Sequence, residues 1–380
     1  MQLRDPLILA QNLIRCRSVT PENNGVLEIL EEALITLGFQ CNRLNFGADF
    51  GRSSIANLYA RRGLGKPNFC FAGHTDVVPE GDGWTVPAFE GRVVGDYLYG
   101  RGAIDMKGAI ACFVSAVARL LSEDTFIGSI SLLITGDEEG CGLDGTIRAL
   151  DWLVEQEEKL DACILGEPTN PHHLGEMIKI GRRGSLNGHL RVLGTQGHVA
   201  YPHLVENPIT RLLAMLQVIT SKPLDGGSTY FQPSTLVLTS IDVGNKITNI
   251  TPSQAYATFN IRFNNNHSGA SLEQWLRQSL NEVGGIYELD IDIIGESFIT
   301  TPGYLCEVLS KAITKITGRI PNLGTTGGIS DARFIRKMCP VVEFGLVGQT
   351  MHQINERVLL TDLEDLTNIY LNVLNTILRD

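Results

Sequence analysis

Residues able to bind metal ions or transfer protons follow four apolar, strand-like runs of the sequence. They are His74 and Asp76 after "NFCFAG", Glu138 and Glu139 after "SISLLIT", Glu167 after "DACILG", and His352 within eight residues of "PVVEFG". In an open α/β sheet, the loops at the carboxyl ends of the strands converge on one crevice, where ligands bind. We therefore expect these side chains to share one site.

The expected site is rich in negative charge. Crowded carboxylates raise one another's pKa values unless cations neutralise them, and imidazole with carboxylate is the ligand set expected for zinc, with cobalt or manganese also possible. Residues two apart on an extended segment point to the same side, so the Asp76 carboxylate can accept the ring proton of His74 and orient it. Asp137 also precedes Glu138, but "GDEEG" is an ordinary turn composition, and we interpret Asp137 as a turn residue.

The segment "GRGAID" offers a rival hypothesis, because it begins like the glycine-rich fingerprint of a dinucleotide-binding oxidoreductase. Its third glycine position is occupied by Asp105, whose charge at a helix N-terminus would repel the pyrophosphate. The sequence also has no G-x-x-x-x-G-K-[ST] motif, which excludes a P-loop. An acidic residue at position 105 suits a metal bridge better.

The alternation of apolar runs predicts the elements that position these residues. Up to about residue 180, strand-like runs alternate with amphipathic segments such as 108–123, which is typical of a mostly parallel α/β sheet with flanking helices. Between residues 182 and 294, strand patterns of period two surround two helical segments, which predicts an antiparallel α+β domain. We predict one domain from residues 1–181 and 295–380, with the domain 182–294 inserted into it.

The last segment of the chain has the pattern of an amphipathic helix. Thr361 and Glu364 form a capping-box pattern, which predicts that this helix begins at Asp362.

Composition narrows the class of protein. The 380 residues carry a formal net charge of −11, which argues against nucleic-acid binding, so an anionic substrate must be met by local arginines. The eight cysteines are at least 22 residues apart and form no C-x-x-C motif. We expect reduced, buried thiols in a cytoplasmic protein with no membrane partner, because neither a signal peptide nor a membrane span is readable.

Five motifs together resemble the zinc-dependent M20 aminoacylase and carboxypeptidase family: "GHTDVVP", "GRGAIDMKG", "GDEEG", "GEPT" and "MHQINE". The resemblance covers essentially the whole chain, including the inserted segment, which in that family is the lid and dimerisation domain. It implies a homodimeric amide hydrolase with two Zn²⁺ ions per subunit, for which Co²⁺ can substitute. A regulatory relative without metal is disfavoured because all of the implied ligands are present.

Carried over residue by residue, the resemblance implies that Asp105 bridges the two metal ions. His74 and Glu167 would complete the protein ligands of one ion, and Glu139 and His352 those of the other.

The resemblance also implies the catalytic and substrate-binding residues. Asp76 would orient a metal-binding histidine, Glu138 would be the general base, and His198 would reach across the dimer to stabilise the oxyanion. The implied substrate-binding residues are Arg182, Ser185, Tyr201, Asn249, Arg262 and Gly328.

Within the family, segment 181–209 is most similar to the branch that hydrolyses N-succinyl-LL-2,6-diaminopimelate to succinate and LL-2,6-diaminopimelate. That branch reads Gly-Gly-Thr-Ser-Asp-Gly where this chain has "GGISDA", with Ile329 and Ala332 as departures. Loss of a threonine hydroxyl that donates to substrate would cost about 0.5 to 3 kcal/mol. A sibling activity, such as acetylornithine deacetylase or aminoacylase, is the nearest alternative.

Overall fold

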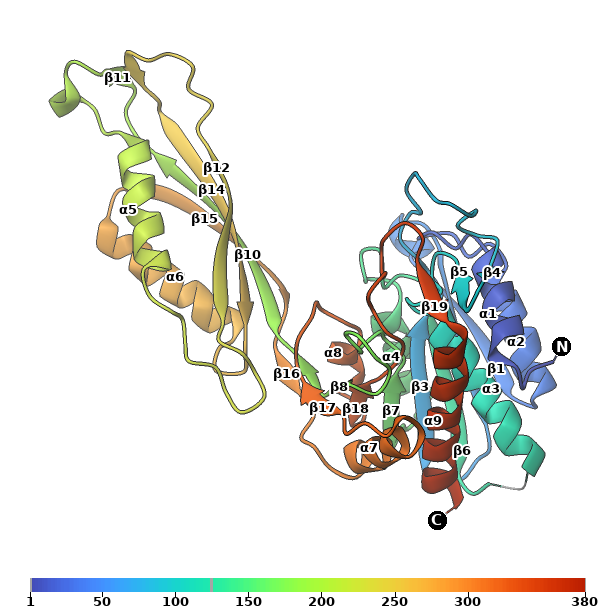
Figure 1. Ribbon diagram of the computed structural model, residues 1–380. Helices are drawn as coiled ribbons and strands as arrows, with labels where there is room; N and C mark the ends of the chain where they lie inside the picture. Colours follow the sequence, from blue (N-terminus) through green and yellow to red (C-terminus); the bar gives the residue numbers. More distant parts are fainter. Residues whose placement is uncertain (1, 124–125, 380) are drawn as a thin grey trace. The chain divides into compact units, whose positions relative to one another are not determined.

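The computed structural model describes residues 2–123 and 126–379 and divides into two compact units (Figure 1). The first unit comprises Met1–Ile180, Thr300–Gly324 and Ser330–Asp380, and the second comprises Gly181–Ile299 and Thr325–Ile329. Among the described residues, every helix is too short or too polar to cross a bilayer. All eight cysteines are free thiols. Five are buried as predicted, whereas Cys16 and Cys41 are half-buried and Cys141 is exposed.

The first unit is built on an eight-stranded sheet in the order β1-β2-β6-β3-β7-β18-β8-β17. Its centre, from β6 through β3 and β7 to β18, is parallel, whereas β1 and β2 add an antiparallel edge. This confirms the predicted mostly parallel α/β sheet. The strands are β1 (Gln40–Phe46), β2 (Ile55–Arg62), β3 (Asn68–His74), β6 (Ser129–Thr135), β7 (Ala162–Leu165), β8 (Met177–Lys179), β17 (Asn322–Gly324) and β18 (Val341–Glu343).

Helices flank this sheet in two groups. Helices α1, α3 and α9 pack against one another, α7 contacts α9, and α4 packs with α8. The helices of this unit are α1 (Pro6–Arg15), α2 (Val26–Thr36), α3 (Lys107–Glu123), α4 (Thr146–Glu155), α7 (Tyr304–Thr317), α8 (Ala332–Ile335) and α9 (Leu360–Arg379), with a short 3-10 turn η1 (Ala48–Phe50). A small sheet joins β4 (Arg92–Val94), β5 (Tyr97–Tyr99) and β19 (Arg357–Leu359).

Three aromatic rings connect β3, α3 and α9. Phe71 of β3 stacks on Phe113 of α3 with 4.4 Å between ring centroids, and Tyr370 of α9 meets both rings edge-on at 5.7 Å. The Tyr370 hydroxyl donates to the carbonyl of Phe344, at 2.6 Å, so its polar end is satisfied inside the core. This cluster fixes β3, which ends at His74, against α3, which begins shortly after Asp105.

Helix α9 begins earlier than predicted. It starts at Leu360, so Thr361 lies within the helix and does not cap it. Glu364 instead forms an ion pair with Arg119 of α3, at 2.7 Å. The predicted apolar face is buried, and includes Leu366, Tyr370 and Leu374, so burial and not the capping pattern determines where this helix packs.

The second unit has an antiparallel sheet in the order β12-β14-β10-β15, covered on one face by α5 and α6. This confirms the antiparallel α+β prediction for the middle of the chain. The elements are β9 (Gly181–Arg182), β10 (Gly184–Leu193), β11 (Gly197–His198), η2 (Pro202–Leu204), α5 (Pro208–Thr220), β12 (Thr235–Asp242), β13 (Ile250–Thr251), β14 (Gln254–Phe263), α6 (Gly269–Val283), β15 (Ile286–Gly295) and β16 (Phe298–Ile299).

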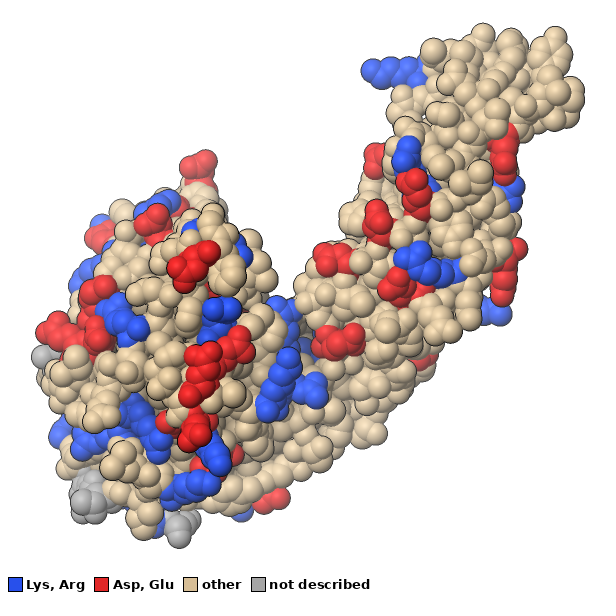
Figure 2. Space-filling model, turned by 180° about the vertical axis from the view of Figure 1, so that it is seen from behind, with Lys and Arg blue, Asp and Glu red and all other residues tan. Residues whose placement is uncertain are grey.

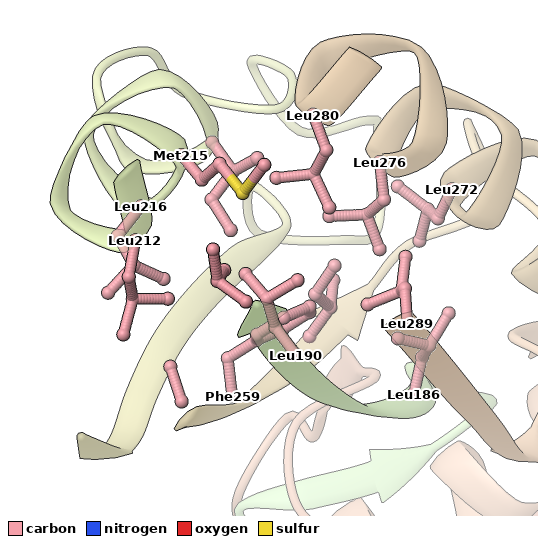
Figure 3. Close-up of a cluster of buried hydrophobic side chains, with 14 of the residues drawn as sticks. Leu186, Leu190, Leu212, Met215, Leu216, Phe259, Leu272, Leu276, Leu280 and Leu289 are labelled. Atoms are coloured by element: carbon pink, nitrogen blue, oxygen red, sulfur yellow. The ribbon is translucent and has the colours of Figure 1, made fainter. Parts of the chain in front are cut away.

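The second unit has a hydrophobic core of its own (Figure 3). Leu190 and Phe259 project from β10 and β14 toward Met215 of α5 and Leu276 of α6, and all four are at most 1% exposed. Alternate residues of β14 are buried, as the period of two in its sequence predicts. The unit is therefore held together by its own buried side chains.

One short loop belongs to a different unit from its neighbours in sequence. Residues Thr325–Ile329 cluster with the second unit, although the sequence prediction placed them in the domain made from the chain ends. The Thr325 hydroxyl donates to the carbonyl of Tyr230 at 2.5 Å, and Arg182 Nη1 donates to the carbonyl of Gly328 at 3.2 Å. These contacts join residues more than 90 positions apart, so no local pattern could predict them.

We expect Leu276→Ala to destabilise the second unit by about 2 to 5 kcal/mol, because the substitution removes buried methyl groups and leaves a cavity. The measurement is urea unfolding followed by circular dichroism. The control is Leu64→Ala, the same truncation at a side chain that is 92% exposed, which should change stability by less than about 0.5 kcal/mol. Equal effects of the two substitutions would contradict the prediction.

Candidate metal centre and substrate-binding residues

The parallel strands bring the predicted metal-binding residues to one edge of the sheet. β3 ends at His74, β6 is followed by Glu138 and Glu139, and β7 is followed by Glu167. β18 leads into the loop that carries His352. Because β6, β3, β7 and β18 are parallel neighbours, their carboxyl ends lie together.

Asp105 lies between two imidazoles. Its Oδ1 is 3.1 Å from His74 Nε2, and its Oδ2 is 3.1 Å from His352 Nε2. Asp105 and His74 are buried, whereas the His352 side chain is 44% exposed. A single carboxylate therefore spans two nitrogen ligands with one oxygen directed to each.

The remaining carboxylates surround this bridge. Glu139 Oε1 is 2.8 Å from His352 Nε2, and Glu167 Oε1 is 3.6 Å from His74 Nε2. In each of two groups of residues, the possible ligand atoms lie within 4.8 Å of one another. One group is His74, Asp105 and Glu139, and the other is His74, Glu138 and Glu167. The structure thus brings all six predicted residues together, and it also gives Glu138 a position from which it could contact a metal ion.

The charged groups of this cluster shift one another's pKa values. Burial and the charge of Glu167 raise the pKa of Glu138 well above its ordinary value, and burial and Asp105 raise the pKa of Glu167. Hydrogen bonds to Asp105 and Glu139 raise the pKa of His352 to about 10. Burial would raise the pKa of Asp105, but its hydrogen bonds to the two histidines outweigh burial and lower it. The excess of carboxylates over cationic groups makes this site favourable for a cation.

The donor set fits divalent cations. Imidazole nitrogen and carboxylate oxygen are ligands for zinc and similar ions. The buried Oε1 of Glu167 has no hydrogen-bond partner among the residues that the structure describes, although such atoms are normally paired. A cation at this cluster would satisfy that oxygen and offset the repulsion among the carboxylates.

Asp76 contacts His74 differently from the way its spacing suggested. His74 Nδ1 is 3.0 Å from the main-chain oxygen of Asp76, whereas the nearest carboxylate oxygen is 3.5 Å away. The carboxylate instead accepts hydrogen bonds from the backbone N–H groups of Glu138 and Glu139, at 3.3 and 3.0 Å, and from the Thr20 hydroxyl at 2.5 Å. Asp76 therefore connects the end of β3 to the loop that carries both glutamates.

Asp137 is more than the turn residue that its sequence suggested. It is 4% exposed, and its carboxylate accepts backbone hydrogen bonds from Cys141, Leu143 and Asp144 at 2.9 to 3.1 Å. The carboxylate thus shapes the loop after β6 from the inside. The composition "GDEEG" holds no signal for this, because the loop folds back over seven residues.

The second unit carries His198 at a short pairing of β11 with β13. The Nδ1 atom of His198 accepts a hydrogen bond from the backbone N–H of Ala200 at 3.1 Å. In the neutral ring this leaves the proton on Nε2, which can donate to an anion. Tyr201 is 55% exposed with its ring 5.8 Å from that of His198, and the Asn249 carbonyl accepts from Val199 N–H at 3.1 Å.

The other predicted substrate-binding residues lie where β9, β10 and β14 meet. Arg182 is buried and donates to the carbonyl of Gly328 at 3.2 Å. Ser185 and Arg262 are directly opposite each other on β10 and β14. Burial and the charge of Arg183 lower the pKa of the Arg262 guanidinium. The guanidinium groups of Arg183 and Arg262 repel each other, so a carboxylate between them would be favourable.

Comparison with known proteins gives matches along the whole chain. Residues 70–376 match the family described as Peptidase family M20/M25/M40. Succinyl-diaminopimelate desuccinylase of Rhodospirillum centenum is 54% identical over 97% of this chain and 96% of its own length. The protein of the same name from Rhodospirillum rubrum is 54% identical over 98% of both chains.

Solved structures share the fold at low sequence identity. Aminopeptidase PepT from Bacillus cereus superposes with a TM-score of 0.81 at 19% identity, over 99% of this chain and 98% of its own. A tripeptidase from Staphylococcus aureus gives 0.77 at 19% identity, over 100% and 99%. A dinuclear metal-binding peptidase of the M20 family from Bacillus subtilis gives 0.71 at 13% identity, over 99% of each chain.

We expect Asp76→Asn to weaken binding of divalent metal ions by about 10- to 100-fold, because the amide replaces a side-chain oxygen that accepts from a backbone N–H with an N–H donor, which displaces the loop that carries Glu139. The measurement is competition for Co²⁺ against a chelator of known affinity. Thr20→Val, which removes only the hydroxyl contact, should have a smaller effect. Unchanged affinity in the Asp76 variant would show that its carboxylate does not position the glutamates.

Proposed function

Because the chain belongs to peptidase family M20/M25/M40, we propose that it hydrolyses N-succinyl-LL-2,6-diaminopimelate to succinate and LL-2,6-diaminopimelate. The observation that carries this proposal is the 54% identity to two proteins named succinyl-diaminopimelate desuccinylase, over nearly the full length of each chain. The reaction would serve lysine and diaminopimelate biosynthesis. The carboxylate and imidazole cluster described above supports a metal-dependent amide hydrolysis.

The cluster would hold two Zn²⁺ ions, with Co²⁺ able to substitute. Asp105 would contribute one oxygen to each ion, with His74 and Glu167 completing one set of ligands and Glu139 and His352 the other. When bound, such ions polarise an amide carbonyl and lower the pKa of a water molecule. The separations of 3.1 Å from Asp105 to each imidazole, 3.6 Å from Glu167 to His74 and 2.8 Å from Glu139 to His352 support this division of the ligands.

Glu138 would act as the general base. Its carboxylate lies beside His74 and Glu167, and burial and the neighbouring carboxylate raise its pKa, which favours proton uptake by this group. It would take a proton from the attacking water and deliver it to the departing amine. The Asp76 carboxylate, which accepts from the Glu138 backbone N–H, would keep this base in place.

The substrate is a polyanion, and the second unit would supply its cationic anchors. Arg182 and Arg262 would bind substrate carboxylates, with Ser185, Tyr201 and Asn249 assisting. Gly328 would offer its main chain, which is exposed beside Ile329. A Cβ at position 328 would meet no atom within 4 Å, so that backbone is open to a ligand.

In a homodimer, His198 of one subunit would donate a hydrogen bond to the oxyanion in the active site of the other subunit. Its exposure and its Nδ1 contact with Ala200 N–H support a free Nε2 donor. Figure 2 shows few charged side chains at the end of the second unit that bears β11, and exposed apolar residues there include Val199, Leu204 and Ile247. Such a surface is typical of a protein interface.

In this proposal residues 1–181 and 295–380 form the catalytic domain, and residues 182–294 form the lid and dimerisation domain.

The substrate assignment is tested by comparing kcat/KM for N-succinyl-LL-2,6-diaminopimelate with that for N-acetylornithine, at one metal loading. We expect a preference for the succinyl substrate of about 100-fold or more, which corresponds to about 2.7 kcal/mol of transition-state binding. The reverse preference would move the chain to a sibling deacylase and make Ile329 a residue that selects the substrate.

We expect Glu138→Gln to lower kcat by about 10²- to 10⁴-fold while metal content is retained, because proton transfer is lost. The measurements are kcat for the succinyl substrate and metal content by atomic emission. Loss of the metal ions in this variant would reassign Glu138 as a ligand.

Mixing two inactive variants tests whether His198 acts across the dimer. In a heterodimer of Glu138→Gln and His198→Ala subunits, one site would contain both groups if His198 comes from the partner. After subunit exchange we expect recovery of about a quarter of the wild-type activity, because half of the dimers would be mixed and each would have one complete site. No recovery in confirmed heterodimers would place His198 in the site of its own subunit.

A further inference from the structure

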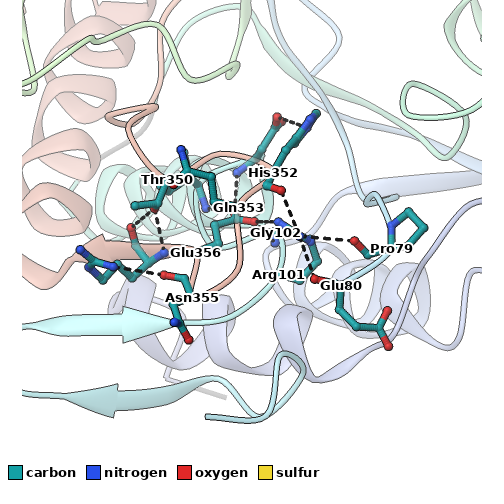
Figure 4. A network of polar contacts seen from close by, with 12 residues as sticks. Pro79, Glu80, Arg101, Gly102, Thr350, His352, Gln353, Asn355 and Glu356 are labelled. Atoms are coloured by element: carbon teal, nitrogen blue, oxygen red, sulfur yellow. Dashed lines mark hydrogen bonds and ion pairs between the residues drawn. The ribbon is translucent and has the colours of Figure 1, made fainter. Parts of the chain in front are cut away.

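A buried ion pair lies beside the cluster of carboxylates and imidazoles in the first unit (Figure 4). We call this cluster, with residues His74, Asp105, Glu138, Glu139, Glu167 and His352, the metal cluster. Arg101 Nη1 donates to Glu356 Oε2 at 2.6 Å, and the two side chains are 2% and 0% exposed. Burial of two charges costs hydration free energy that their attraction does not always repay, so an ion pair of this kind is weak evidence for a stabilising role. Its other contacts indicate a different role.

The Glu356 carboxylate binds the backbone that leads into Asp105. Its Oε2 accepts from Gly102 N–H at 3.1 Å, and its Oε1 accepts from Ile104 N–H at 2.8 Å and from Asp105 N–H at 3.3 Å. Together with Arg101, four donors converge on one carboxylate. Charge-assisted hydrogen bonds of this kind are short and strongly oriented. They fix the segment from which the Asp105 side chain projects.

Arg101 extends the network to two further loops. Its Nη2 is 3.3 Å from the carbonyl oxygens of Pro79 and Glu80 and 3.4 Å from that of His352. The Trp84 ring covers the guanidinium, with 5.5 Å from Cζ to the ring centroid. One guanidinium therefore connects the segment after β3 with the loop that carries His352, a role that suits a planar group with several donors.

His352 needs such support, because its backbone lies in the left-handed region with φ of 60°. A non-glycine residue with this φ is strained and persists only where surrounding contacts determine it. Asn355 in the same loop has φ of 59°, and its Oδ1 accepts from Thr85 N–H at 2.8 Å. Thr350 also closes the loop, since its Oγ1 accepts from Arg357 N–H at 3.1 Å.

We propose that Arg101 and Glu356 are positioning residues for the metal cluster, which fix the backbones of Asp105 and His352 so that their side chains meet as a pair of ligands. Neither side chain contacts the substrate or the reacting atoms in this proposal. Both residues lie inside the motifs "GRGAIDMKG" and "MHQINE", whose metal-ligand residues they support. The inference rests on the proposed function only in that it requires the cluster to bind metal.

The decisive variant is Glu356→Gln. A carboxamide has one acceptor oxygen, so its NH₂ group must face two of the donors that the carboxylate binds. We expect Co²⁺ affinity, measured by chelator competition, to fall by about 10- to 100-fold. The visible absorption spectrum of the Co²⁺-loaded protein should also change, because the ligands are displaced. With saturating metal, kcat should fall while KM changes little.

Glu158→Gln is the matched control. Glu158 pairs with Arg61 at 2.5 Å and is also largely buried. Its carboxylate accepts a hydrogen bond from the side chain of Asn68. Asn68 is the first residue of β3 and His74 is the last, so Glu158 lies at the opposite end of this strand from the candidate metal site. We expect this control to lower the melting temperature of the metal-free protein, with Co²⁺ affinity and spectrum equal to those of the wild type.

The inference is overturned if Glu356→Gln resembles the control, with lower stability but wild-type Co²⁺ affinity and spectrum. Arg101→Lys is a second variant for the case in which Glu356→Gln does not fold. It keeps the charge but cannot reach Glu356 and the carbonyls together, so it should weaken Co²⁺ binding in the same way. If neither variant folds while the control does, the pair belongs to the fold, and the inference is also overturned.

Failure of the proposed function gives a different result. Co²⁺ affinity and spectrum are measured without substrate, so a wild-type protein that hydrolyses another N-acyl amino acid leaves this test intact. A wild-type protein that binds no Co²⁺ would refute the metal centre itself.

Discussion

Repulsion among carboxylates is the constraint on which the first unit depends. Ligand atoms of Asp105 and Glu139 lie within 4.8 Å of each other and of His74, and those of Glu138 and Glu167 form a second such group around the same imidazole. Such a cluster is unfavourable unless cations enter it, since each buried charge loses hydration and raises the pKa of its neighbours. The scaffold must therefore hold these side chains against their mutual repulsion.

The scaffold does this mainly by fixing backbone rather than side chains. Parallel strands deliver the loops to one edge of the sheet, and the Phe71, Phe113 and Tyr370 rings hold β3, α3 and α9 together. Buried carboxylates at Asp76 and Glu356 then accept several backbone N–H groups each from the loops of the cluster. The same chemical group forms the candidate metal site and supports its backbone, and the donors around each carboxylate determine which role it has.

The second unit is organised around a different requirement. Its apolar core between the antiparallel sheet and α5 and α6 makes it compact by itself. It gathers Arg182, Ser185 and Arg262 at the strands where it joins the rest of the chain, and it takes in the loop Thr325–Ile329.

The sequence by itself determined the alternation of strands and helices, because apolar periodicity reports which face of an element is buried. It also predicted that the acids and imidazoles after these strands share one site, because the carboxyl ends of strands in an open sheet converge. Only the tertiary structure decided what each acid binds. Asp76 accepts from the loop after β6, Asp137 is buried, and Glu356 supports Asp105. These choices depend on which backbone donors meet a carboxylate in space, and donors from distant segments leave no local pattern in the sequence.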